Sequence, residues 1–126
     1  MARNGDAAHK RFKQTHTMDE RKRVSEQLRR QYPSMIPVIV EKDPKSDVPE
    51  IERKKFLVAE SMTVGTFLIE LRRQMTSLRP EQAIYLFVNN TSPYGGAKMA
   101  QLAQEHLDAD GFLYITYSGE NSFGSL

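Results

Sequence analysis

The chain has no cysteine and no long apolar run, and both absences restrict its function. Without cysteine it cannot form disulfides, thiolate metal sites or a cysteine nucleophile. No segment approaches the roughly 18 to 20 apolar residues of a membrane span. The first residues also lack the apolar region of a signal peptide. We therefore expect any membrane attachment to be added chemically.

Nothing in the sequence indicates an active site. His9, His16 and His106 have no obvious nucleophile partner, and we expect His106 to pack against the domain or to be partly exposed. Gly95-Gly96 lacks the following Lys-Ser/Thr of a phosphate-binding loop and is typical of a turn. We expect a protein that is not an enzyme and that uses no metal or cofactor.

The 126 residues fit one globular domain, with 39% hydrophobic and 27% charged residues. Charge is uneven: residues 1–32 hold nine Lys/Arg against four Asp/Glu, whereas the remainder holds nine against twelve. A basic segment binds nucleic acid, anionic lipid or acidic proteins, or is simply a solvated helix face. We expect no nucleic acid, because Phe12 and Tyr32 are the only aromatics there and no reading motif accompanies them.

The chain reads as a short extension followed by alternating strands and helices. Residues 1–17 are polar and are expected to form a flexible basic extension. Residues 18–33 form a helix whose apolar face carries Met18, Val24, Leu28 and Tyr32. A second helix starts at the N-cap Thr63 and runs to Met75, and a shorter one covers 99–106. The expected strands are 36–42, 56–58, 84–90 and 112–118. The pattern alone supports an α+β fold.

The end of the chain is its most informative segment. Phe112–Gly124 (FLYITYSGENSFG) reads as a final strand that runs into a polar tail, followed by Ser125 and Leu126. A glycine has no Cβ, so it can thread a narrow cleft and leaves its carbonyl unhindered for acyl transfer. The pattern indicates a carboxyl group presented for conjugation at Gly124.

Five collinear blocks within residues 18–124 resemble the autophagy ubiquitin-like modifiers, the family of the microtubule-associated-protein light chains and the GABA-receptor-associated protein. The blocks are IPVIVEK, SDVPEIERKKFLV, MTVGTF, IYLFVNN and DGFLYITYSGENSFG. The resemblance implies a ubiquitin-like β-grasp fold with a four-stranded sheet, a long packing helix and an extra N-terminal helix. The domain would cover 18–120, with a helical subdomain at 18–33. The tail 121–126 would be processed after Gly124.

The resemblance also implies a function. The chain would be trimmed by a cysteine protease, carried by activating and conjugating enzymes, and joined through Gly124 to phosphatidylethanolamine on autophagosomal membranes. It would be cytoplasmic before conjugation, and on the membrane it would recruit receptors with aromatic-x-x-aliphatic motifs. Two alternatives stay open: a non-conjugated adaptor that links vesicles or cytoskeleton, and attachment to protein amines.

Members of the family bind an extended peptide along the edge strand that aligns with residues 54–59, by strand addition. By position, the first pocket, for an aromatic ring, comprises Leu28, Pro37, Ile39, Lys55, Leu57 and Phe112. The second pocket, for an aliphatic residue three places later, comprises Phe56, Val58, Met62 and Phe67. Basic residues that would steer acidic ligands are Arg53, Lys54, Arg72 and Arg73.

The chain departs from the family pattern at Val24, Met35, Ala59 and Glu70. Ligand preference is therefore not carried over from relatives. Glu70 either narrows and charges the second pocket, or turns to solvent and pairs with Arg73 three residues later.

Overall fold

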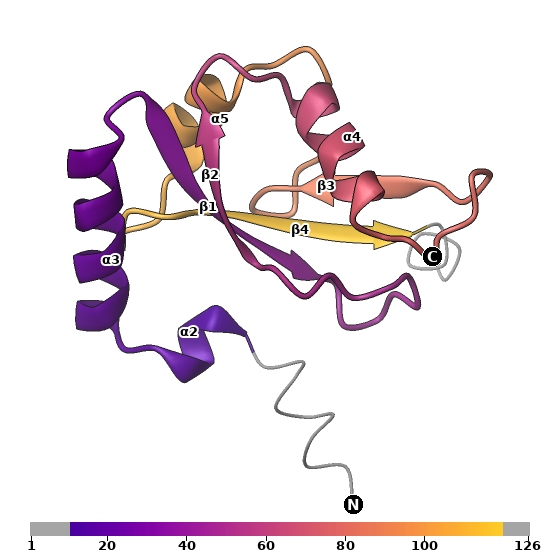
Figure 1. The fold of residues 1–126 in the computed structure, drawn as a ribbon, viewed down its shortest axis with the longest axis horizontal. Helices are drawn as coiled ribbons and strands as arrows, with labels where there is room; N and C mark the ends of the chain where they lie inside the picture. The colour runs from indigo at the N-terminus through magenta and orange to yellow at the C-terminus, as the bar shows by residue number, and fades with distance from the viewer. Residues whose placement is uncertain (1–10, 120–126) are drawn as a thin grey trace, which may run out of the picture.

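A computed structural model describes residues 11–119 as a four-stranded mixed sheet with helices on both sides (Figure 1). The strands are β1 (Met35–Lys42), β2 (Lys55–Ala59), β3 (Ile84–Phe87) and β4 (Leu113–Gly119), in the order β2-β1-β4-β3. β1 and β4 are parallel, and the other two pairs are antiparallel. The helices are α2 (Phe12–Thr15), α3 (Met18–Gln31), α4 (Val64–Arg73) and α5 (Met99–His106). The expected α+β, ubiquitin-like fold is confirmed.

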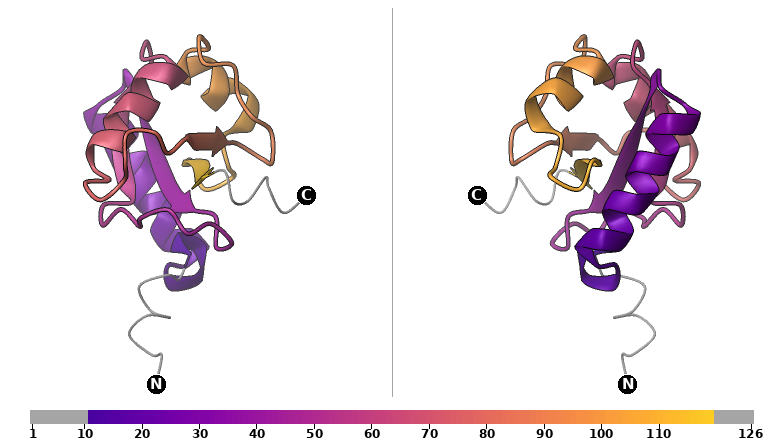
Figure 2. Two further views of the ribbon diagram at one scale, coloured as in Figure 1. Left: turned by 90° about the vertical axis from the view of Figure 1, so that its right-hand side faces the viewer. Right: turned by 90° about the vertical axis from the view of Figure 1, so that its left-hand side faces the viewer.

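The central strand β1 is buried on both faces of the sheet. Its even-numbered residues Ile36, Val38 and Val40 belong to the main hydrophobic core, beneath α4 and α5. Side chains alternate along a strand, so Pro37 and Ile39 face the opposite side, where α2 and α3 lie (Figure 2). The sheet therefore separates a large core from a smaller apolar layer under the N-terminal helices.

The loop between β1 and β2 is anchored to the sheet by Tyr117 of β4. The Tyr117 hydroxyl donates to the carbonyl of Pro49 (3.0 Å) and accepts from the amide of Ile51 (3.1 Å). Burial raises the pKa of Tyr117 to about 12. Val48 and Ile51 of the loop are buried in the core. These contacts position the start of β2.

The helix expected after Thr63 is present but shorter than the pattern predicted. Thr63 Oγ1 accepts the amide of Thr66 at 3.2 Å, which confirms the N-cap. α4 ends at Arg73, and the Met75 amide bonds back to the carbonyl of Arg72 (3.0 Å) in a tightened turn. Met75 is buried, but it lies beyond the helix.

The third strand also ends earlier than expected, at Phe87. Val88 and Thr91 exchange both backbone hydrogen bonds around Asn89 and Asn90. Both asparagines have positive φ, 50° and 63°, a conformation that asparagine tolerates better than most residues. The segment 88–91 is therefore a tight turn.

The prediction of a flexible extension up to residue 17 is wrong for residues 11–17, which are packed on the domain; residues 1–10 lie outside the described part. The amide of Phe12 donates to Glu41 Oε2 (2.7 Å), and its ring centroid lies 5.4 Å from that of Phe112. Lys13 Nζ lies 2.7 Å from Asp108 Oδ1. A single aromatic in a polar segment gave no periodic signal for this helix.

The predicted contact face of α3 is wrong in part. Met18 and Tyr32 are 41% and 48% exposed, whereas Arg21 and Ser25 are buried. Arg21 Nε donates to Asp110 Oδ2 at 2.8 Å, so a polar contact fixes this helix to the turn before β4. Within residues 11–119, no helix is both long and apolar enough to span a bilayer.

Candidate functional site

The free edge of β2 is the main candidate site. Among the described residues, β2 pairs only with β1. Two backbone bonds, from the Val40 amide to the Lys54 carbonyl (2.8 Å) and from the Glu60 amide to the Ser34 carbonyl (3.1 Å), mark hydrogen-bonded residue pairs. Such pairs alternate along an antiparallel ladder, so Lys55, Leu57 and Ala59 point their N–H and C=O groups away from β1. This edge can accept a further strand.

The residues assigned to the first pocket lie on the α3 side of this edge. Leu57 stands opposite Pro37 and Lys55 opposite Ile39, so all four share one face. Pro37, Ile39 and Phe112 are fully buried. Leu57 and Leu28 are half-buried and Lys55 is exposed. The available apolar surface is thus provided by Leu57 and Leu28, above a floor of buried side chains.

The residues assigned to the second pocket lie on the opposite face. Phe56, Val58 and Phe67 are members of the main core and are each at most 7% exposed. The rings of Phe56 and Phe67 meet edge to face, with centroids 5.8 Å apart. Only Met62 is half-buried and packed on the outside of this cluster. A ligand side chain would therefore rest on the core itself at this position.

The basic residues Arg53, Arg72 and Arg73 have internal partners, and the sequence suggested only the partner of Arg73. Arg53 Nε donates to the Lys55 carbonyl (3.0 Å), and its guanidinium lies 4.6 Å from the Phe56 ring. Because that carbonyl points outward from the edge, a bound strand would compete with Arg53 for it. Arg72 donates to the carbonyls of Gln82 (2.7 Å) and Pro80 (3.3 Å).

The third of these residues, Arg73, pairs with Glu70 at 2.9 Å. The side chains of Glu70 and Arg73 are 47% and 72% exposed. Of the two alternatives for Glu70, this geometry favours the solvent-facing one over a carboxylate that charges the second pocket.

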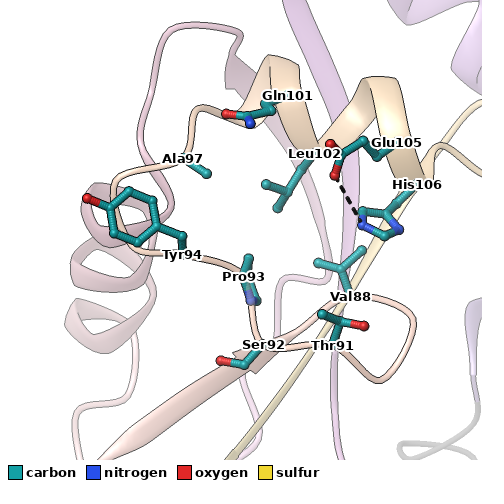
Figure 3. Close-up of a pocket in the computed structure, with 10 residues that line it drawn as sticks. All are labelled: Val88, Thr91, Ser92, Pro93, Tyr94, Ala97, Gln101, Leu102, Glu105 and His106. Carbon is teal, nitrogen blue, oxygen red and sulfur yellow. Dashed lines mark ion pairs between the residues drawn. The ribbon is translucent and has the colours of Figure 1, made fainter.

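A separate cavity of about 230 Å³, which the sequence did not foresee, lies between the loop after β3 and α5 (Figure 3). His106 lies at its rim, with Nδ1 3.0 Å from Asn89 Nδ2 and Nε2 3.7 Å from Glu105 Oε1.

The expected turn at Gly95-Gly96 is confirmed by the bond from the Ala97 amide to the Tyr94 carbonyl (3.0 Å). His106 is partly buried, as expected.

Comparison of the sequence with known proteins identifies its relatives. The model of the family described as "Autophagy protein Atg8 ubiquitin like" matches residues 20–124. The chain is 54% identical to Autophagy-related protein 8 of Dictyostelium discoideum, over 90% of this chain and 93% of that protein. It is 49% identical to Autophagy-related protein 8d of Arabidopsis thaliana, over 90% of this chain and 93% of that protein.

Solved structures agree with the sequence relatives. The crystal structure of Trypanosoma brucei ATG8 superposes with a TM-score of 0.83, at 38% identity, over 88% of this chain and 95% of that one. Plasmodium falciparum Atg8, solved in complex with a P. falciparum Atg3 peptide, superposes with a TM-score of 0.79, at 36% identity, over 87% and 98%. The chain therefore belongs to the Atg8 family of ubiquitin-like autophagy proteins.

Proposed function

We propose that the chain is joined through Gly124 to the amine of phosphatidylethanolamine. A cysteine protease removes Ser125 and Leu126, and activating and conjugating enzymes carry the new carboxyl group as an adenylate and then a thioester. The lipid amine attacks the Gly124 carbonyl, an amide forms and the enzyme thiol leaves. The lipid brings two acyl chains, which are enough for stable anchoring. The chain is thus cytoplasmic before conjugation and on the autophagosomal membrane afterwards.

Two observations support this proposal. The family match extends to residue 124 and so includes the glycine. The chain has no cysteine, so it can supply the acyl group of a thioester but not the thiol. The tail 121–126 lies outside the described residues. The rival functions, an unconjugated adaptor and a modifier of protein amines, differ in the intact mass of the cellular protein: full length for the adaptor, a protein adduct for the modifier.

We further propose that the β2 edge binds extended peptides with an aromatic-x-x-aliphatic motif. The observation that carries this is the outward direction of the N–H and C=O groups of Lys55 and Leu57, beside the apolar surface of Leu57 and Leu28. Main-chain hydrogen bonds would supply affinity and the two pockets specificity. The peptides proposed are those of autophagy receptors and, by analogy with the P. falciparum complex, an Atg3 peptide.

Leu57→Ala is expected to weaken binding of such a peptide by about 1 to 3 kcal/mol, roughly tenfold to more than a hundredfold. Leu57 is half-buried and outside the main core, so the free energy of unfolding changes little. Tyr94→Ala, at an 80% exposed site away from β2, is the matched control. Calorimetric titration of the three proteins with one peptide measures the effect. Equal affinities for the parent and Leu57→Ala would remove Leu57 from the site.

Glu70→Leu is expected to change the affinity for the same peptide by less than about twofold, because an exposed ion pair contributes little. The carboxylate is paired with Arg73 and half exposed, so a ligand does not have to desolvate it. The same titration measures this effect. A fivefold or greater gain in affinity would instead place Glu70 in the second pocket.

A further inference from the structure

A second concave surface lies where the two helix layers meet at one end of the sheet. This surface, called here the α3–α5 cleft, has a volume of about 480 Å³. Its apolar lining comes from the segment after α3, the start of β1, and α5 with the residue that follows it. These residues are Pro33, Met35, Ile36, Ala100, Ala103 and Leu107. Ala100 and Ala103 are one helical turn apart, and their small side chains leave this space open.

The α3–α5 cleft is continuous with the β2 edge through Glu60. Glu60 directly follows Ala59, the last residue of β2, and lines the cleft. Its amide donates to the Ser34 carbonyl (3.1 Å), and its carbonyl accepts from the Ala100 amide (3.0 Å). Glu60 is thereby fixed both to the residue before β1 and to the first turn of α5. A peptide that leaves the end of β2 meets the cleft next.

The order of the two pockets determines which end of the peptide arrives there. The aromatic anchor is assigned beside Lys55 and Leu57, and the aliphatic anchor three residues later beside Val58 and Met62. The bound chain therefore runs in the direction of β2, and its carboxyl-terminal flank passes Glu60. The free edge of β2 and the far side of β1 are two strand spacings apart, about 10 Å. About three residues of extended peptide cover this distance.

The charges of the cleft indicate which side chains the peptide flank should carry. Arg29 lines the cleft on the α3 side and Glu60 on the β2 side. Among residues 11–119, neither side chain has an ion-pair partner. The peptide flank would pass Glu60 and end at Arg29. It should therefore carry an apolar side chain for the apolar lining, followed by a carboxylate that pairs with Arg29.

We propose that the α3–α5 cleft is a further subsite of the peptide-binding surface, which takes an apolar side chain about three residues after the aliphatic anchor and an acidic residue after it. The proposal rests on the peptide-binding function proposed for the β2 edge. It adds a specificity determinant outside the two pockets.

Two synthetic peptides test the proposal by calorimetric titration of the full chain. Both contain the same acidic-aromatic-x-x-aliphatic core, and they differ only in the flank, which carries either Leu-Glu or Ser-Ser at the third and fourth positions after the aliphatic anchor. The Leu-Glu peptide is expected to bind about tenfold more tightly, since burial of one leucine is partly offset by ordering of the flank.

Ala103→Leu fills the cleft and is expected to abolish this tenfold difference while the affinity for the Ser-Ser peptide stays unchanged. Ala100→Leu, at an exposed position, should have the same effect if Ala103→Leu proves unstable. Gln101→Leu is the matched control, because it adds the same side chain to the face of α5 that lines the other cavity (Figure 3). It should retain the tenfold difference.

The outcomes separate the two proposals. If the parent binds neither peptide, the function proposed for the β2 edge is wrong, and the cleft subsite with it. If the parent binds both peptides equally, or if the difference survives both Ala103→Leu and Ala100→Leu, the edge function stands and the cleft subsite is overturned.

Discussion

A chain in which Gly124 is replaced by alanine is expected to remain free of lipid when it is incubated with the protease, the activating and conjugating enzymes, and vesicles that contain phosphatidylethanolamine. In the proposed reaction the added methyl group lies on the residue whose carbonyl is attacked, and it widens a segment that would have to pass through a narrow cleft. A small displacement of the reacting atoms lowers rates on the order of a hundredfold. Intact mass spectrometry measures the lipid adduct.

Two further chains locate the step that fails. A chain that ends at Gly124 should be conjugated without the protease, because Ser125 and Leu126 are already absent. A Gly124→Ala chain that also lacks Ser125 and Leu126 should still not be conjugated, because the proposed activation and transfer both use the carboxyl group of residue 124. All these chains should unfold at the same temperature, since β4 ends at Gly119, before the tail. A normal yield of lipid-linked Gly124→Ala chain would show that Gly124 is not the conjugation site.

The regular elements could be predicted because their apolar residues follow the period of a helix or a strand. The N-cap Thr63 and the strand around Ile36–Lys42 are local signals of this kind. The missed helix α2 and the wrongly predicted contact face of α3 both depend on contacts between distant residues. Phe12 packs on Phe112, and Arg21 pairs with Asp110, 89 residues away in the sequence. No window of neighbouring residues contains that information, so local patterns predict neither α2 nor the buried face of α3.

The position of β2 at the edge of the sheet was predictable for a different reason. The assignment of β2 as the peptide-binding edge came from the resemblance, and the observed strand order leaves that strand at the edge. The internal partners of Arg53 and Arg72 are backbone carbonyls, which carry no sequence signal. The α3–α5 cleft likewise depends on how α5 packs near the start of β1. In the sequence, the small residues Ala100 and Ala103 indicate only a good helix former and do not predict a cleft.

The polar contacts around Asp110 hold α3 on the sheet, and Asp110 itself is only 1% exposed. Its carboxylate accepts hydrogen bonds from Arg21 Nε (2.8 Å), the Tyr114 hydroxyl (2.5 Å) and the Phe112 amide (2.9 Å). Burial and the bond to Asp110 raise the pKa of Tyr114, so its hydroxyl remains a donor. The Ser25 hydroxyl donates to the Asp110 carbonyl (2.5 Å).

The close approach of α3 also requires the glycine after Asp110. Gly111 has φ +90°, and a Cβ at this position would clash with the Ser25 side chain. The carboxylate and this glycine therefore act together. Asp110 supplies the acceptors, and Gly111 lets the helix come close enough to reach them.

Asp110→Ala is expected to lower the free energy of unfolding by about 3 to 5 kcal/mol, because it leaves a buried guanidinium, a phenol and an amide without their common acceptor. Glu81→Ala is the matched control. It removes a carboxylate from an exposed pair with Arg79 (2.9 Å), which should cost less than about 1 kcal/mol. Urea unfolding followed by circular dichroism measures both changes.

Asp110→Asn removes the charge of the side chain but keeps its shape. The amide keeps one acceptor oxygen but turns a donor toward groups that are themselves donors. It should therefore destabilise the chain more than Glu81→Ala does. Because the residues assigned to the first pocket lie between α3 and the sheet, loosening α3 should also weaken the proposed peptide binding in both Asp110 variants. Unfolding free energies equal to that of Glu81→Ala would mean that apolar contacts alone hold α3 in place, and that the buried carboxylate contributes no net stability.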